Sequence, residues 1–162
     1  MTASTSGKGK RRKASSEKPQ PARVGALDDV IAFNLRLAQN ASFKAFKRHT
    51  GDANLRPGWF AMLSIIHDNP GITPMSLSKA SGRDKSTLTP VLRDLLRLKL
   101  IERQTVESDK RSYTLSLTPL GATKLATLAE HAAAHDRELD EIVGEGKEEF
   151  VRMLKRIHSL LD

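Results

Sequence analysis

The sequence predicts a mainly α-helical fold with one small two-stranded β-sheet. Three observations predict it. Apolar residues recur at spacings of three and four through long segments near both ends of the chain, as in helices with one buried side. Residues 112–118 alternate between polar and apolar side chains, as in a half-buried strand. Thr-Pro pairs at 73–74 and 118–119 are typical of helix starts, because threonine caps free N–H groups and proline suits the first turn.

The first 23 residues are expected to form a disordered basic tail. They hold seven basic residues and one acidic residue among many Ser, Gly and Pro, with too few apolar side chains to offset the entropy of ordering. The run KGKRRK is compatible with an arm that follows a nucleic-acid groove. A solvated tail with nonspecific attraction to phosphate is the interpretation we favour.

The next two segments are expected to be helices. Residues 24–48 repeat apolar side chains at helical spacing, and extra aromatic positions widen the apolar surface beyond one side. Pro57 fits the first turn of a second helix over 57–69. That helix is apolar nearly all round, so we expect it to be buried.

Two shorter helices are predicted to follow, with a tight turn between them. The first runs from Pro74 to Gly82, and Asp84 is placed to cap the second. The second has a leucine-rich stripe that leaves Ser and Thr residues on its other side. Pro90 interrupts its hydrogen bonding, so this helix either begins near Thr87 or has a distorted first turn.

The remaining chain predicts a hairpin and two helices. Residues 100–106 and 112–118 are expected to be antiparallel strands joined by a polar turn at 107–111. A long helix should begin at Pro119 and end near Val143, before a final amphipathic helix over 147–162.

Composition limits the classes of function. The chain has 162 residues, a net charge of +8 and a pI near 10.0, which favours an acidic partner such as nucleic acid. The absence of cysteine excludes disulfides and thiol chemistry. No apolar run approaches the length of a membrane span, and the N-terminus lacks a secretory apolar core, so a cytoplasmic protein without membrane contact is expected. Nucleotide-binding loops and nucleophile elbows are missing, so we expect neither an enzyme nor a cofactor.

The order helix, helix, turn, helix and hairpin is that of a winged helix-turn-helix, which places one helix in the DNA major groove. Residues 72–111 carry nine basic and five acidic groups, which suits such a face. Small hydroxyl side chains and Arg can contact bases or phosphates, and a basic hairpin tip can reach the neighbouring backbone or minor groove. The predicted DNA-binding residues are Ser86, Thr87, Thr89 and Arg93 in the major groove, Arg83 and Lys85 near phosphates, and Lys110 and Arg111 at the wing.

The chain resembles the MarR family of bacterial transcriptional regulators. The resemblance depends on GRDKSTLTPVLRDLLRLKLIER at 82–103, on the D-x-R wing tip at 109–111 and on LTPLG at 117–121, and it covers residues 24–162. It implies a homodimer that binds pseudo-palindromic operators in double-stranded DNA, usually as a repressor released by a small molecule. Residues 24–56 and 119–162 would form the helical dimerisation region and residues 57–118 the DNA-binding lobe. The short amphipathic final helix independently favours a partner surface.

The resemblance also implies an effector cleft between the first two helices, the fifth helix and the DNA-binding lobe. Residues 69–92 look most like regulators of aromatic-acid breakdown, some of which sense acyl-CoA thioesters, whose phosphates suit a basic rim. The alternative is that the apolar candidates belong to the core and the polar ones to the surface. The candidate effector residues are Arg36, Asn40, Phe43, Lys44, Arg48, His49, Trp59 and Met62.

Two other questions stay open at this stage. His131 and His135 have a spacing that can bind zinc, but solvated helix histidines are more common, so no metal site is predicted. The alternatives to an effector-controlled regulator are a nonspecific architectural DNA-binding protein and a ligand-binding helical dimer with a vestigial DNA face.

Overall fold

The computed structural model describes residues 22–51, 56–106 and 109–161. The predicted disordered tail therefore lies almost entirely outside the described residues. Within the described part there are six α-helices and one two-stranded antiparallel sheet, which confirms the predicted fold class. The elements are α1 (Ile31–Thr50), α2 (Pro57–Asp68), α3 (Pro74–Ser81), α4 (Lys85–Arg97), β1 (Ile101–Val106), β2 (Asp109–Leu117), α5 (Pro119–Val143) and α6 (Lys147–Leu161).

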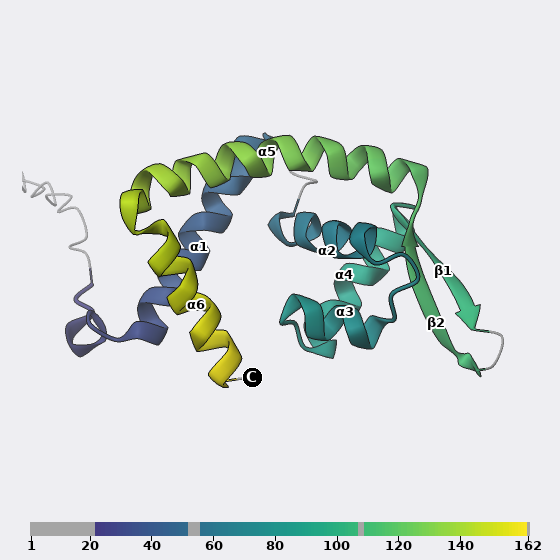
Figure 1. Ribbon diagram of the computed structural model, residues 1–162, viewed down its shortest axis with the longest axis horizontal. Helices are drawn as coiled ribbons and strands as arrows, with labels where there is room; N and C mark the ends of the chain where they lie inside the picture. Colours follow the sequence, from purple (N-terminus) through teal and green to yellow (C-terminus); the bar gives the residue numbers. More distant parts are fainter. Residues whose placement is uncertain (1–21, 52–55, 107–108, 162) are drawn as a thin grey trace, which may run out of the picture.

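Helix α5 connects two groups of elements (Figure 1). Helices α1 and α6 lie under one half of α5, while α2, α3, α4 and the hairpin lie under its other half. Both α1 and α2 contact α5. The molecule thus has an α1–α6 end and a winged helix-turn-helix lobe, joined by one continuous helix.

The first helix begins later than the sequence predicted. The expected helix over 24–48 is replaced by a 3-10 turn at Gly25–Leu27 and by α1 from Ile31. Gly25 has a positive φ of 58°, and Val30 is extended, so the helical path is interrupted twice before Ile31. The helix continues to Thr50, where Gly51 ends it in the left-handed conformation.

The predicted caps are confirmed at three helix starts. The side chain of Thr73 accepts a hydrogen bond from Ser76 N, that of Asp84 from Thr87 N, and that of Thr118 from Gly121 N. Each cap satisfies an N–H group that the first helical turn leaves without a partner.

The hydrophobic core lies in the lobe, around α2. Leu63 and Ile66 on this helix are fully buried, as the apolar character of residues 57–69 predicted. They pack with Leu77 of α3, Leu95 of α4 and Leu128 of α5, so one core holds four helices together. The core fixes the back of α4 and leaves its polar side free.

The hairpin is attached to this core at its base. Leu115 of β2 is fully buried. Its backbone N donates to Ile72 O and its carbonyl oxygen accepts from Gly71 N, in the segment just before α3. Strand β2 begins at Asp109, so the expected turn over 107–111 is too long: residues 109–111 belong to the strand, because Asp109 already pairs with Val106.

The start of α5 lies very close to the start of the hairpin. Thr118 donates hydrogen bonds from its backbone N and its hydroxyl to Leu100 O, and its hydroxyl also lies 2.6 Å from Lys99 O. A Cβ atom at the buried Gly121 would lie 1.8 Å from Leu100 O, so only glycine fits there. This contact determines where α5 leaves the lobe.

Candidate nucleic-acid interface and ligand pocket

Helix α4 presents the predicted major-groove residues on one exposed side. Leu88, Leu92 and Leu95 on its other side are buried in the lobe core. The hydroxyl side chains and Arg93 are exposed. An apolar back and a polar front are what a helix needs to enter a groove at a fixed angle.

Pro90 does not displace the start of this helix. Helix α4 begins at Lys85 and continues through Pro90 to Arg97. The hypothesis that it begins near Thr87 is therefore wrong, because Asp84 caps the N–H of Thr87 and Leu88 N bonds to Asp84 O at 3.0 Å. Proline has no N–H, so Ser86 O lacks its helical donor and stays available at the exposed front.

The hydroxyl groups on this front donate hydrogen bonds within the helix. Ser86 Oγ lies 2.6 Å from Asp84 Oδ1, Thr87 Oγ1 3.0 Å from Asp84 O, and Thr89 Oγ1 2.7 Å from Lys85 O. The hydrogen bonds from Ser86 and from Thr87 N lower the pKa of the Asp84 carboxyl below its ordinary value. A hydroxyl that donates to its own helix still has acceptor capacity for a base amino group.

A groove of about 850 Å³ runs beside the front of α4, between α3 and β2. Lys85, Thr89 and Arg93, at helical spacing, all line it, so the structure brings these three predicted residues together. Among the described residues no carboxylate pairs with Arg93, whereas Asp94 on the same helix pairs with Arg56 and Arg97. The guanidinium of Arg93 is therefore available to an external anion.

The other predicted DNA-binding residues are placed differently. Arg83 is half-buried and its guanidinium lies against Gly58 at the start of α2, where a Cβ atom would be 2.7 Å from its Nη2. The backbone of Lys110 and Arg111 lies in β2 near the hairpin tip. Their side chains lie outside what the structure describes.

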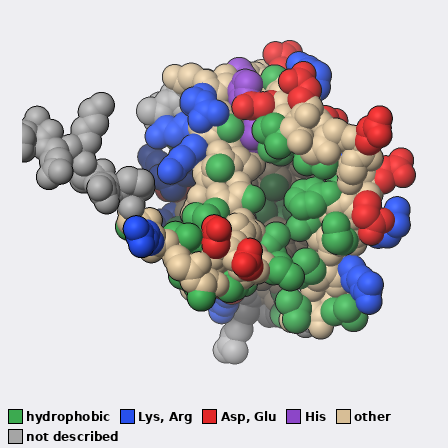
Figure 2. Space-filling model, turned by 90° about the vertical axis from the view of Figure 1, so that its left-hand side faces the viewer, with side chains coloured by type: hydrophobic (Ala, Val, Ile, Leu, Met, Phe, Trp, Pro, Cys, Tyr) green, Lys and Arg blue, Asp and Glu red, His purple; other side chains and the backbone are tan. Residues whose placement is uncertain are grey.

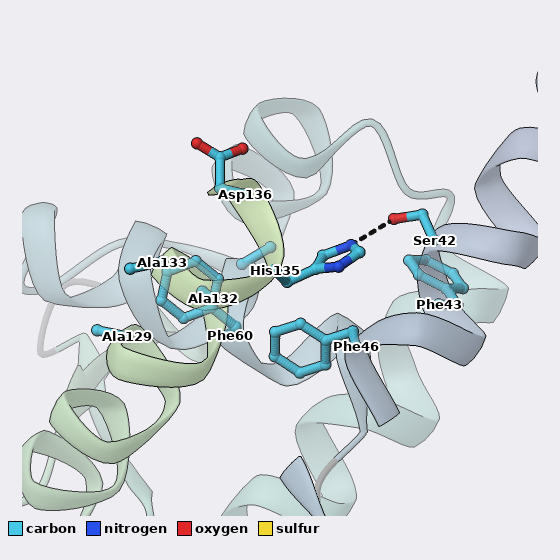
Figure 3. A pocket seen from close by; sticks show the side chains of 10 residues that line it. Ser42, Phe43, Phe46, Phe60, Ala129, Ala132, Ala133, His135 and Asp136 are labelled. Carbon is cyan, nitrogen blue, oxygen red and sulfur yellow. Dashed lines mark hydrogen bonds between the residues drawn. The ribbon is translucent and has the colours of Figure 1, made fainter. Parts of the chain in front are cut away.

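A second hollow lies between α1, α2 and α5 (Figure 3). It has a volume of about 520 Å³ and a mainly apolar lining. Phe43 and Phe46 come from α1, Phe60 from α2, and three alanines from α5. Small side chains on α5 leave the space that the phenylalanine rings border.

One end of this pocket is polar. His135 of α5 points toward α1, and its Nε2 lies 2.9 Å from Ser42 Oγ. His135 is buried as a residue, and its ring meets the Phe46 ring edge-on at 5.9 Å between centroids. The pocket therefore combines aromatic walls with a hydroxyl and an imidazole, which suits a ligand with an apolar body and one polar end.

The predicted effector residues are divided by the structure. Phe43 lines the pocket. Trp59 and Met62 are 4% and 1% exposed and belong to the lobe core. Arg36, Asn40 and Lys44 are exposed on α1 and do not line it. Sequence reasoning missed Ser42, Phe46 and His135, although the small-residue run AAA at 132–134 was a signal of close helix packing.

Arg48 and His49 lie at the end of α1 and face Glu138 of α5. His49 Nε2 donates to Glu138 Oε2 at 2.8 Å, and Arg48 Nη2 lies 3.9 Å from Glu138 Oε1. The hydrogen bond from His49 is the main cause that lowers the pKa of the Glu138 carboxyl. These contacts connect α1 and α5 one turn beyond the pocket.

Comparison with known proteins identifies the family. The family model described as "MarR family" matches residues 55–113, which include α2, α3, α4 and the first part of the hairpin. A protein described as a transcriptional regulatory protein for the hcr operon of Thauera aromatica is 30% identical over 136 residues, covering 83% of this chain and 82% of the relative. The chain belongs to the MarR family. It is therefore a transcriptional regulator of the MarR type.

Solved MarR-type structures share the whole fold. The transcriptional repressor CouR, bound to a 23-mer DNA duplex, is 26% identical, with a TM-score of 0.75 over 85% of this chain and 99% of that one. CouR bound to p-coumaroyl-CoA gives a TM-score of 0.76 at 24% identity, over 85% and 98%. The PcaV regulator of Streptomyces coelicolor, solved with its natural ligand, gives 0.78 at 20% identity, over 88% and 100%. These family members are regulators rather than enzymes.

The described helices include none that is both long and apolar enough to cross a membrane.

Proposed function

We propose that this MarR-family protein is a homodimeric repressor that binds a pseudo-palindromic operator and is released by an aromatic acid or its CoA thioester. The observation that carries the proposal is the exposed front of α4, opposite the leucines that fix the back of the helix in the core. The exposed residues are Ser86, Thr87, Thr89 and Arg93. Each chain supplies one such helix, so a two-fold dimer presents two, about 34 Å apart on successive major grooves.

The charges on this face support contact with DNA. Lys85 and Arg93, both basic, line the same groove of about 850 Å³ beside α4. Arg93 is exposed and can reach guanine O6 and N7 or a phosphate, whereas the half-buried Arg83 supports the start of α2 instead. CouR, which this chain resembles over nearly its whole length, was solved on a DNA duplex.

The α1–α6 end supports a dimer. Helix α6 has no buried residue, yet its apolar side chains lie at helical spacing. Figure 2 shows hydrophobic side chains gathered on this end of the molecule. The large exposed apolar residues of the two helices are Ile31, Leu37, Phe43, Phe150, Met153, Leu154, Leu160 and Leu161. Monomeric proteins rarely expose so continuous an apolar surface, so a second copy is its expected cover.

The pocket between α1, α2 and α5 supports an aromatic effector. Phenylalanine rings suit an aromatic body, and the Ser42–His135 pair suits a carboxylate or thioester oxygen at one end. Arg36, Lys44 and Arg48 are exposed nearby on the same helix, and they can attract the phosphates of a CoA moiety. CouR and PcaV were solved with p-coumaroyl-CoA and a natural ligand, respectively.

The DNA-binding part of the proposal is tested by gel-shift titration. The probe is the intergenic DNA upstream of the protein's own gene, with random competitor DNA at ~150 mM salt, where purely electrostatic binding is weakened. A discrete, competitor-resistant shift is expected. Arg93→Ala should weaken it by about 5–150-fold, since a direct arginine contact is worth about 1–3 kcal/mol.

Deletion of residues 1–23 is the matched control. Specific binding should survive this deletion, because the deletion removes none of the α4 residues proposed to contact the bases. If the deletion abolishes binding while Arg93→Ala leaves it unchanged, the protein is an architectural DNA-binding protein and the repressor proposal fails.

The effector part is tested by thermal shift and by release of the operator probe. Aromatic acids and their CoA thioesters are screened, and Ser42→Ala is compared with Asn40→Ala, which changes an exposed residue on the same helix outside the pocket. Ser42→Ala should weaken binding of the active ligand by about 5–10-fold, because it removes one hydrogen bond to the polar end of the ligand. Asn40→Ala should leave the affinity unchanged. No stabilisation by either ligand class would refute this part alone.

A further inference from the structure

A cluster of potential metal ligands lies beside the pocket. His49 in the last turn of α1 meets His135 and Glu138, which are one helical turn apart on α5. One ring nitrogen from each histidine and one carboxylate oxygen all lie within 4.8 Å of one another. His49 Nε2 is 2.8 Å from Glu138 Oε2, and His135 Nδ1 is 3.9 Å from the same oxygen.

His135 provides the second observation, because one of its ring nitrogens has no partner. Its side chain is 9% exposed, and Nδ1 is fully buried without a hydrogen bond among the described residues. A buried polar atom without a partner destabilises the folded state. Its position toward Glu138 and His49 means that a bound cation would satisfy it.

Ser42 explains why this nitrogen can bind a cation. Its hydroxyl lies 2.9 Å from His135 Nε2 and can accept a hydrogen from that nitrogen. A proton on Nε2 leaves the lone pair on Nδ1, the nitrogen that points into the cluster. Histidines that bind metals commonly donate their other N–H in this way, which fixes the ring and its tautomer.

We propose that His49 Nε2, His135 Nδ1 and the Glu138 carboxylate bind one divalent transition-metal ion of the Zn²⁺ class. Two imidazoles and one carboxylate are a donor set typical of Zn²⁺, whereas Mg²⁺ and Ca²⁺ prefer oxygen ligands. Donor atoms around a tetrahedral ion at about 2.0–2.1 Å are about 3.3 Å apart. The distances of 2.8 and 3.9 Å lie on either side of that value, so small side-chain rotations suffice.

Arg48 is the group that opposes a metal here. Its Nη2 lies 3.9 Å from Glu138 Oε1, and its side chain is 70% exposed, so the guanidinium is free to turn into solvent. The ion-pair contact is long and exposed, and such pairs contribute little to stability. Coordination of a transition-metal ion by two imidazoles outweighs that contribution.

The site shares Ser42 and His135 with the proposed effector pocket. Its test uses neither DNA nor an organic ligand, so this proposal and the proposed function can fail separately. The test uses the full-length protein freed of metal by a chelator and then dialysed. Co²⁺ is titrated for its ligand-field absorption, and Zn²⁺ is titrated by calorimetry and by displacement of Co²⁺. One ion per chain, with an absorption intensity typical of four-coordination, is expected.

His49→Gln and Glu138→Gln should each weaken binding of the ion by at least tenfold. His131→Gln is the matched control, because it removes another histidine of α5, one turn away, that is not in the cluster. Ser42 is a positioning residue. Its replacement in Ser42→Ala should weaken metal binding by about 10–100-fold and change the Co²⁺ spectrum without removing a ligand. Circular dichroism and metal-free thermal unfolding confirm that each variant is folded.

Three results would overturn the proposal. The first is binding no tighter than that of exposed surface histidines, with no fixed stoichiometry. The second is equal loss in His131→Gln and His49→Gln, which would assign a different donor set. The third is unchanged affinity in both His49→Gln and Glu138→Gln while their metal-free stability equals that of the wild type.

Discussion

Gly121→Ala is expected to destabilise the protein, although alanine in place of glycine usually stabilises a helix. In an exposed helix interior the exchange gains about 1 kcal/mol, because alanine loses less backbone entropy on folding. Gly121 is in the first turn of α5, where a Cβ atom would lie 1.8 Å from Leu100 O and 2.8 Å from Leu100 C. Both are backbone atoms, so no side-chain rotation removes the overlap.

The magnitude follows from what must move. A contact below 3.0 Å is not tolerated, so α5 or the Leu100 carbonyl must shift by more than an ångström. Overpacking of this kind costs about 1–3 kcal/mol. The shift also disturbs the hydrogen bonds from Thr118 N and Thr118 Oγ1 to Leu100 O, which are worth about 1 kcal/mol each. After the propensity gain, the net loss is about 2–4 kcal/mol.

The assay is urea and thermal unfolding at one fixed protein concentration, since the stability of the proposed dimer would depend on concentration. A loss of this size lowers Tm by roughly 5–15 °C for a domain of this length. Gly146→Ala is the control, because no heavy atom lies within 4 Å of a Cβ there and φ is not positive. It should be neutral or stabilise by about 0.4–1 kcal/mol. A Gly121→Ala protein as stable as the wild type would refute the close approach of α5 to Leu100.

Three further predictions concern stability. Leu63→Ala, at a fully buried position on α2, should reduce the free energy of unfolding by about 2–5 kcal/mol in urea titrations. Thr118→Ala removes the cap of α5 and should cost about 0.5–2 kcal/mol by the same measurement, less than Gly121→Ala. The hydrogen bond from His49 lowers the pKa of Glu138 from its ordinary value of 4.5, so its stabilising effect is complete above that pH and is lost as pH falls through the lower folded-state pKa. Thermal unfolding is measured between about pH 3 and 6, which brackets this range. As pH falls, Tm should decrease more steeply in the wild type than in Glu138→Gln.

Local signals made most of the fold predictable. Thr73, Asp84 and Thr118 precede apolar repeats, and each caps a helix as expected, because N-capping depends on atoms only three residues away. The first helix was misplaced because a helix boundary among weak signals depends on backbone conformation. The positive φ of Gly25 and the extended Val30 are not encoded in the apolar repeat.

The grouping of Lys85, Thr89 and Arg93 was predictable for the same reason, since the three residues share one side of a single helix. The pocket could not be predicted in this way, because its residues come from three helices. His49 and Glu138 are 89 residues apart, and Ser42 and His135 are 93 apart, so no local pattern relates them. The sequence suggested pairing His131 with His135, whereas the fold places His135 against α1.

The position of α5 offers a route by which binding of the proposed effector would affect the proposed DNA-binding face. The helix begins against Leu100 at the base of the wing, and its middle, at Ala132 and His135, forms one wall of the pocket. A helix of 25 residues is about 37 Å long, so a tilt of about 5° at one end moves the other by about 3 Å. Because Gly121 lets α5 pack directly on the lobe, such a tilt would carry α4 with it and change the separation of the two recognition helices. A ligand that binds one separation better than the other would then shift the population away from the DNA-binding state.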